Sequence, residues 1–269
     1  MRITLSLAAG ALVASVASAQ VSQQAVPPTP PAEKRAYVDT LHGEVRRDDY
    51  FWLRVKTDPA VRTYLEAENK YAEAVLAPLH PLRDRLYQEM LARIKQTDLS
   101  VPYRNNGWYY YTRTVEGQQY PIFARKRGSL TAPEQVTLDQ NQMARGQTFM
   151  SIGAYSVSDD ANLLAYSFDS TGYRQYALRV KDLRTGEILP VRADRVTSVT
   201  WAADNKTLFY AVEDPVSKRS YQVYRHVLGT PEHTLLYEEK DERFSTYVGR
   251  SRSKHYLFMY VGSLASGGQ

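Results

Sequence analysis

The chain has 269 residues, of which 43% are hydrophobic and 23% charged, and its formal net charge is +5. These values are ordinary for a globular protein and exclude a disordered acidic tail, a collagen or a coiled coil. Tyrosine is unusually frequent, with 21 residues against 7 Phe and 3 Trp. Because aromatic residues are enriched in strands, this composition favours β-structure.

Charge and cysteine usage narrow the class of partner. Basic and acidic residues are interleaved along the chain, and the one basic triplet, residues 125–127, is typical of a strand end or turn. A nucleic-acid interface needs a clustered basic face, so we expect no nucleic-acid partner. The chain has no Cys, which excludes a disulfide and a thiolate metal site but is compatible with export.

The first 32 residues predict an exported protein. Arg2 precedes an apolar stretch, residues 3–16, and the small residues Ala17-Ser18-Ala19 follow, which is the layout of a signal peptide cut after Ala19. The apolar stretch is short for a membrane span of about 20 residues, and an uncleaved anchor is the alternative. Residues 20–32 are polar and Pro-rich, which predicts an extended linker. We therefore expect a periplasmic or secreted protein without stable membrane association after cleavage.

Residues 33–100 are predicted to form an N-terminal helical segment. Asp58 stands directly before a proline, which is the N-cap signal of a first helix that Pro78 ends. Pro81 opens a second helix, and the short joint between the two predicts an αα-hairpin. Each helix carries one apolar stripe, so we expect each to need a partner surface.

The remaining residues, 101–269, alternate with period two between tight turns. An aromatic run, residues 108–112, and the segment 119–126 flank a turn and predict a hairpin. Equivalent strands recur further on: Tyr166 and Tyr210 are 44 residues apart, and Phe258 follows after another 48. Four-stranded propeller blades repeat at about 40–50 residues. The predicted fold is therefore mainly β, a partial β-propeller behind an α-helical segment.

The number of repeats predicts that the ring is incomplete. A propeller closes with 4–8 blades, whereas residues 101–269 hold about three and a half repeats. We expect the sequence to be the N-terminal part of a longer protein. An unpaired strand edge in the fourth repeat would favour aggregation of the isolated chain.

A search for reaction chemistry finds no site. The sequence contains no G-x-S-x-G, no phosphate-binding loop and no H-E-x-x-H. Ser266 comes nearest to a nucleophile motif, but Leu264 stands where its first Gly belongs. None of the five His pairs with another at metal-ligand spacing, and we interpret His226 and His255 as surface or packing residues. The expected catalytic, cofactor-binding and metal-binding residues are therefore none.

Two other patterns have structural interpretations. Adjacent Asp159 and Asp160 are more typical of a β-turn, where Asp bonds its own backbone, than of a carboxylate pair. The aromatic run at residues 108–111 could stack bases or sugars, but alternation favours sheet core and edge.

Several motifs in order resemble oligopeptidase B (protease II), a member of the prolyl oligopeptidase family of serine peptidases. The first reads H-G-E-V-R-R-D-D-Y-F-W-L-R at residues 42–54, closer to oligopeptidase B than to prolyl oligopeptidase, whose equivalent reads more like D-P-Y-x-W-L-E. The others are Tyr64–Asn69, Arg93–Asp98, Tyr221–His226 and Leu236–Asp241. The resemblance covers the chain from about residue 31 to residue 261.

The resemblance implies a seven-bladed propeller that caps an α/β-hydrolase domain, with the helical segment packed against the hydrolase part. It implies cleavage of short peptides after Arg or Lys, with the propeller gating access. The Ser, Asp and His of that family lie in the hydrolase domain, beyond Gln269, so no catalytic residue is assigned in this chain and the chain alone is expected to be inactive. Members of that family are often cytosolic, whereas the signal peptide predicted here indicates export.

Three functions follow as hypotheses. The first is the N-terminal part of an exported oligopeptidase B-like serine peptidase, whose partners are short peptides and its own hydrolase domain. The second is a non-catalytic propeller that binds a partner protein. The third is a prolyl-specific peptidase of the same family.

Overall fold

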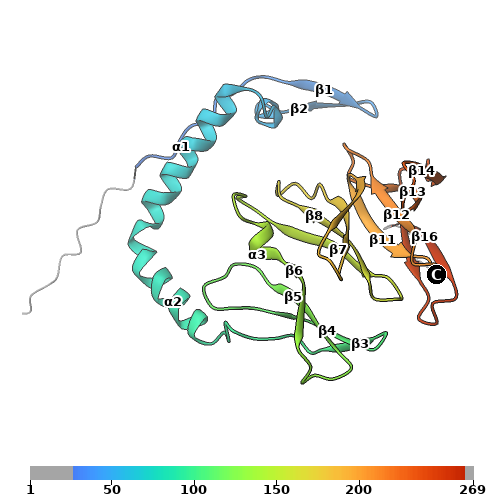
Figure 1. Ribbon diagram of the computed structural model, residues 1–269. Helices are drawn as coiled ribbons and strands as arrows, with labels where there is room; N and C mark the ends of the chain where they lie inside the picture. Colours follow the sequence, from blue (N-terminus) through green and yellow to red (C-terminus); the bar gives the residue numbers. More distant parts are fainter. Residues whose placement is uncertain (1–26, 264–269) are drawn as a thin grey trace, which may run out of the picture. The chain divides into compact units, whose positions relative to one another are not determined.

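The computed structural model describes residues 27–263, and the chain divides after Ile94 into two compact units. Figure 1 shows the helical first unit and the strand-rich second unit. The predicted signal peptide, the start of the predicted linker and Ser266 lie outside the described residues.

The first unit begins with a hairpin and a short helical turn. Strands β1 (Val38–Leu41) and β2 (Glu44–Arg47) pair antiparallel, and both residues of their two-residue turn, His42 and Gly43, have positive φ. Such turns match the twist of a hairpin. The 3-10 helix η1 (Phe51–Arg54) follows and contributes the buried Trp52, whose indole N–H donates to the Glu33 carbonyl at 2.9 Å. This part of the resemblance motif is therefore a packed local structure.

The predicted first helix is confirmed with its cap. Helix α1 spans Pro59–Leu76, and the Asp58 carboxylate accepts a hydrogen bond from the Ala60 backbone N–H at 2.8 Å. This bond satisfies one of the amide groups that have no partner within the first helical turn.

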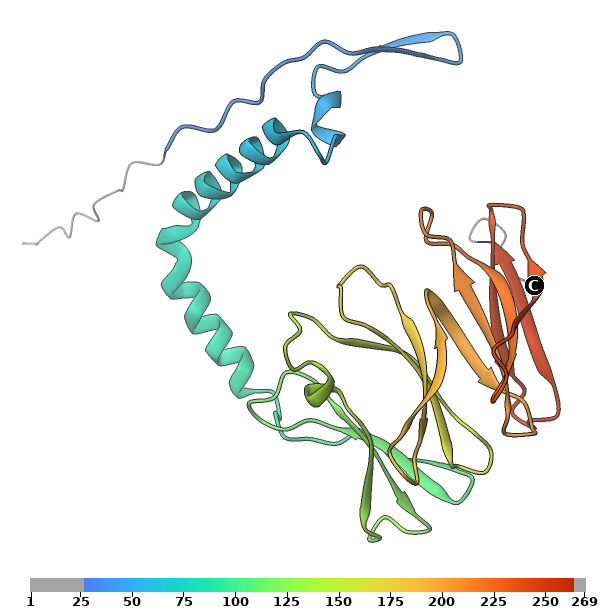
Figure 2. The same ribbon diagram turned by 45° about the horizontal axis from the view of Figure 1, so that its top comes forward.

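The predicted αα-hairpin is wrong. Helix α2 (His80–Ala92) follows α1 through a 3-10 turn, η2 (Ala77–Leu79), and the two helices meet at an elbow without running side by side (Figure 2). Leu76, Ala77, Leu79 and His80 all keep right-handed helical φ and ψ angles. Proline removes an N–H donor and is tolerated in the first turn of a helix, so it bends the chain here without reversing it.

The second unit consists of consecutive antiparallel sheets, each built from neighbouring strands in chain order. Three sheets have four strands and the last has two among the described residues. The first sheet contains β3 (Tyr103–Asn105), β4 (Trp108–Arg113), β5 (Ile122–Arg127) and β6 (Glu134–Asp139), with the short helix α3 (Gln140–Met143) after it. The second contains β7 (Ser151–Val157), β8 (Leu163–Asp169), β9 (Ala177–Asp182) and β10 (Ile188–Ala193). The third contains β11 (Val196–Trp201), β12 (Thr207–Glu213), β13 (Ser220–Val227) and β14 (His233–Glu238), and the fourth contains β15 (Phe244–Arg250) and β16 (Leu257–Ser263).

The core lies between the faces of successive sheets. Leu178 and Val180 of the second sheet and Trp201 and Leu208 of the third are at most 2% exposed and belong to one cluster. The Trp201 indole N–H donates across the same interface to the Ser156 carbonyl at 2.9 Å. The first strands contact each other from sheet to sheet, β7 with β11 and β11 with β15. The sheets therefore fan out from their first strands (Figure 2), as the blades of the predicted propeller do.

The turn between the first two strands has the same geometry in the second, third and fourth sheets. The backbone N–H of its first residue donates to the carbonyl of the residue five positions later. The backbone N–H of its fourth residue donates to the carbonyl of the first. That second donor is Ala161, Asn205 or Lys254, each with positive φ, at 61°, 56° and 65°. These residues are 44 and 49 positions apart in the sequence. The predicted repeat is therefore a repeat of this turn as well as of its strands.

The fourth sheet differs from the prediction at one end. The sequence pattern predicts a strand at residues 255–258, whereas β16 begins at Leu257. The Tyr256 carbonyl instead accepts the Ser251 backbone N–H at 2.9 Å and closes the turn. Tyr256 belongs to the turn and not to the strand, because its carbonyl pairs with the Ser251 amide and an unpaired backbone amide costs free energy.

Candidate functional site

The described residues 27–263 contain no group of three or more acidic, His or Cys side chains placed to hold a metal ion. The Asp pair behaves only partly as predicted. Asp160 bonds within its own turn, accepting from the Asn162 backbone N–H at 3.1 Å. Asp159 instead forms ion pairs with Arg250 and Lys254, which lie in the fourth sheet and the turn that follows β15. Sequence spacing gives no signal for this contact, because the partners are about 90 residues away.

A histidine pair was also missed by sequence reasoning. His226 on β13 and His233 on β14 are cross-strand partners whose rings stack with centroids 4.2 Å apart. The Tyr210 hydroxyl lies 2.5 Å from His233 Nδ1. Burial and the neighbouring His226 ring lower the pKa of His233, which favours its neutral form. Of the two roles predicted for His226, surface or packing, its burial favours packing, since the residue is 3% exposed.

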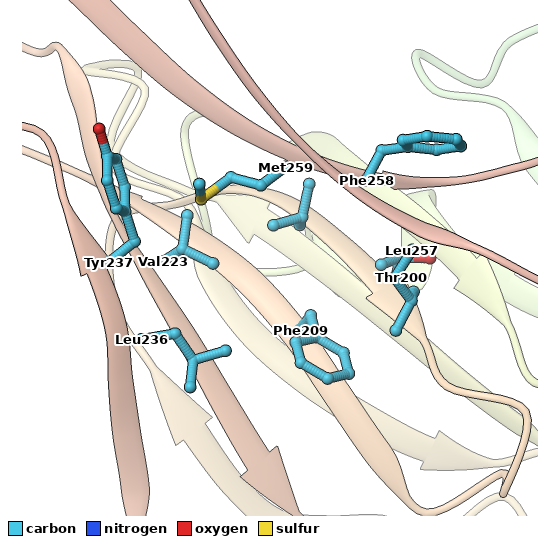
Figure 3. A pocket seen from close by; sticks show the side chains of 9 residues that line it. Thr200, Phe209, Val223, Leu236, Tyr237, Leu257, Phe258 and Met259 are labelled. Carbon is cyan, nitrogen blue, oxygen red and sulfur yellow. The ribbon is translucent and has the colours of Figure 1, made fainter.

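An apolar pocket of about 300 Å³ lies between the third and fourth sheets. Figure 3 shows its side chains, which come from β11 to β14 of the third sheet and from β15 and β16 of the fourth. It is lined mainly by Phe209, Val223, Leu236, Val248, Leu257 and Met259. Its lining also includes the hydroxyl-bearing Thr200 and Tyr237 but no carboxylate, His, Lys or Arg, so the pocket is suited to an apolar side chain.

Strand β16 extends this apolar surface. Its residues Leu257 to Val261 are each between 41% and 53% exposed. β16 pairs only with β15 in the described part of the chain. A contiguous apolar surface of this kind marks a site of packing against further protein.

A second pocket, of about 260 Å³, has aromatic walls. Tyr103 and Tyr110 stack with centroids 5.5 Å apart, and Phe123 and Tyr155 stack at 5.2 Å. Burial raises the pKa of Tyr110 and of Tyr155, so both hydroxyls stay protonated at neutral pH. Tyr110 and Tyr111 of the aromatic run are 3% and 8% exposed, so these two side chains belong to the core.

The first unit carries the apolar stripe that the sequence predicts. Leu82, Leu86, Met90 and Ile94 follow one another at four-residue steps and are between 43% and 62% exposed. None of the helices in the described range is long and apolar enough to cross a membrane. An exposed apolar stripe on one face of a helix is typical of a surface that packs against protein.

Comparison with known proteins places these features in a family. Residues 29–267 match the family model described as prolyl oligopeptidase, N-terminal beta-propeller domain. Dipeptidyl aminopeptidase BI of Pseudoxanthomonas mexicana is 42% identical over 98% of this chain, and Protease 2 of Moraxella lacunata is 33% identical over 87%. The chain spans 39% and 35% of the length of these two relatives.

Solved structures agree with this result. Oligopeptidase B from Trypanosoma brucei, in a closed form with covalently bound antipain, matches 87% of this chain with a TM-score of 0.78 and 30% identity. The match covers 36% of that chain. The mainly β fold with an incomplete propeller is thereby confirmed. The chain belongs to the prolyl oligopeptidase family of serine peptidases and carries the family's N-terminal β-propeller domain.

Proposed function

We propose that this chain is the access-controlling propeller of an exported serine peptidase that hydrolyses short peptides after Arg or Lys. The observation that carries the proposal is the 30% identity to oligopeptidase B over 87% of the chain, together with the 33% identity to Protease 2. The propeller would admit short peptides to the reaction and exclude folded proteins, because closure of a lid or domain controls entry in many enzymes.

The reacting groups would come from an α/β-hydrolase domain that follows residue 269. In its triad the Ser attacks the scissile carbonyl, the His transfers the proton and the Asp orients the His. The share of each relative that this chain spans, 39% and 35%, supports a further domain of this kind. The exposed stripe at Leu82, Leu86, Met90 and Ile94 supports a surface on which that domain packs.

Export is a further part of the proposal. The signal layout of residues 1–19 supports secretion or a periplasmic location, with Gln20 as the first residue of the mature protein. Intact-mass measurement of protein recovered from the periplasm or medium tests it. A mature mass that starts at Gln20 is the expected result, and recovery of the full chain in the membrane fraction would favour the uncleaved anchor.

A second candidate is the release of dipeptides from a free N-terminus. The 42% identity to Dipeptidyl aminopeptidase BI over 98% of the chain favours it. The first candidate recognises an Arg or Lys side chain of the substrate, whereas the second recognises its free N-terminus. The residues that bind either group would lie in the hydrolase domain.

Two assays separate these functions. Residues 20–269 alone should hydrolyse neither a fluorogenic Arg ester nor a dibasic peptide above blank, because the described residues provide no triad. The protein encoded by the whole reading frame is then given one peptide that contains both Arg and Pro, in two forms with a free and with an acetylated N-terminus, and mass spectrometry identifies the products.

Each outcome selects one function. Cleavage of both forms after Arg is expected for the first proposal. Cleavage of the free form alone, with loss of two residues, selects the second candidate. Cleavage only after Pro selects a prolyl-specific peptidase, and no hydrolysis by the whole protein selects a non-catalytic binding module.

A further inference from the structure

The innermost turns of the sheets are linked by their side chains. These are the turns that join the first strand of each sheet to the second. The Asn106 side-chain amide in the first sheet donates to the Asp159 carbonyl in the second at 2.8 Å. The Asp160 backbone N–H in the second sheet donates to Asn205 Oδ1 in the third at 3.0 Å. The innermost turns of the first and second sheets, and of the second and third, are thus joined by a hydrogen bond.

Lys254 makes a longer connection, between sheets that are not neighbours. Its Nζ atom lies in the turn of the fourth sheet and donates to Asn106 Oδ1 at 2.7 Å and to Asn105 Oδ1 at 3.1 Å, both in the first sheet. In chain order the second and third sheets stand between these two. The lysine side chain therefore spans the inner side of the fan, where the first strands of successive sheets lie together.

Asp159 is the centre of this contact. Its carboxylate lies 3.2 Å from Lys254 Nζ and 2.9 Å from an Arg250 guanidinium nitrogen. The Arg250 side chain is 12% exposed and the Asp159 side chain 28%, so water screens these pairs less than it screens a surface pair. Burial alone would raise the pKa of Asp159, but the hydrogen bonds from Lys254 and Arg250 outweigh it and lower that pKa. The carboxylate stays charged at neutral pH, as the contact requires.

We propose that Lys254, Asp159 and Arg250 form a cross-axis latch, an electrostatic contact that holds the innermost turns of the first, second and fourth sheets together and closes this end of the propeller axis. Movement of the first sheet away from the fourth, and passage along the axis at this end, require that the latch opens. The proposal concerns the propeller alone and does not depend on the proposed peptidase activity.

The chain offers a matched control for Lys254. Lys254 has a φ of 65° and Lys218 a φ of 61°, so both lysines occupy the left-handed region, which Asn tolerates well. Both also pair with a carboxylate, but the partner of Lys218 is Glu213 in its own hairpin, at 3.3 Å. Lys254→Asn and Lys218→Asn therefore remove the same charge from the same backbone conformation, and only the first opens the latch.

Hydrogen–deuterium exchange on the full chain tests the latch. Amide exchange is followed in unmodified protein and in Lys254→Asn, Lys218→Asn and Asp159→Asn, after circular dichroism has shown equal strand content. The decisive segment is residues 103–108 of the first sheet, which contains Asn106, 148 residues from Lys254 in the sequence.

In this segment we expect exchange to become about three- to tenfold faster in Lys254→Asn and in Asp159→Asn, in line with the loss of a partly buried ion pair and its hydrogen bonds. Lys218→Asn should leave the segment unchanged. Acceleration confined to residues 250–257 in Lys254→Asn would show a purely local turn contact and would overturn the proposal.

A salt series on the unmodified chain gives an independent check. At 1 M salt the screening length falls to about 3 Å, so the latch should weaken and exchange of residues 103–108 should accelerate. The same salt step should have little effect on this segment in Lys254→Asn. Equal salt responses in both proteins would also overturn the latch.

Discussion

Arg125 on β5 stacks over the indole ring of Trp108 on β4, with the guanidinium carbon 3.9 Å from the ring centroid. The same guanidinium is 2% exposed and donates to the Ala161 carbonyl of the second sheet at 2.6 Å and to Gln135 Oε1 at 2.8 Å. One residue of the basic triplet, Arg125, is therefore buried and connects the first sheet to the second.

Substitution of Arg125 should destabilise the second unit strongly. Arg125→Met keeps the aliphatic volume but leaves the Ala161 carbonyl and the Gln135 amide oxygen without their donor. We expect a loss of about 2–4 kcal/mol in the free energy of unfolding. Urea unfolding followed by tryptophan fluorescence measures this loss.

Arg127 of the same triplet provides the control. Its guanidinium carbon lies 5.9 Å from the Trp108 ring and its side chain is exposed. Arg127→Met should change the free energy of unfolding by no more than about 0.5 kcal/mol. Equal losses in the two variants would contradict the assignment of Arg125 to the joint between the sheets.

Gly153 on β7 should not tolerate a side chain. A Cβ atom at this position would lie 2.7 Å from Tyr176 Cδ1 and 2.8 Å from Ser167 Oγ, and Ser167 is fully buried. Gly153→Ala should therefore cost about 1–3 kcal/mol in the free energy of unfolding through overpacking. Thermal unfolding of both proteins measures the difference.

Gly262 on β16 is the matched glycine for this experiment. It also lies in a strand, but nothing stands within 4 Å of the Cβ that Ala would add. Gly262→Ala should leave the melting temperature unchanged or slightly raised, because Ala restricts the unfolded chain more than Gly does. A lower melting temperature in Gly262→Ala than in Gly153→Ala would contradict the predicted clash.

His233 should make the stability of the second unit depend on pH. Burial and the stacked His226 lower its pKa in the folded state below the ordinary value of 6.5. The neutral form therefore contributes stability above pH 6.5, and this stability is lost as the pH falls through the folded-state pKa. Melting temperatures between pH 7.5 and pH 5 should fall less steeply in His233→Gln than in the unmodified protein.

Between pH 7.5 and pH 5, the titration of His233 can be told apart from that of a carboxylate with a lowered pKa. Hydrogen bonds and the charge of Arg184 lower the pKa of Asp182 to about 2, so that carboxylate titrates well below pH 5 in the folded protein. If His233→Gln shows the same slope as the unmodified protein between pH 7.5 and pH 5, the stacked pair is not its source.

The fold could be predicted largely from short-range patterns. The strands centred on Trp108, Tyr166 and Tyr210 alternate with period two, and the turns between them carry Asn, Asp or Gly, so spacing alone indicates blades. The cap at Asp58 was equally readable, because the residue before a helix satisfies amide groups next to it in the chain. The family followed from several motifs in order, and the comparisons confirm it.

The αα-hairpin was wrong for a physical reason. Prolines at positions 78 and 81 indicate where hydrogen bonding is interrupted, but they do not set the direction of the chain afterwards. The backbone angles from Leu76 to His80 stay helical, and only the structure shows that the chain bends there without reversing.

The amino-acid sequence by itself determined the strands, the turns, the cap and the family, because each depends on residues close together in the chain or on motifs in a fixed order. Only the tertiary structure decided which distant side chains meet. His226 stacks on His233 through strand register, Arg125 joins two sheets, and Lys254 reaches Asn106 from 148 residues away. These contacts depend on how the sheets pack, and the spacing of residues along the chain carries no record of that packing.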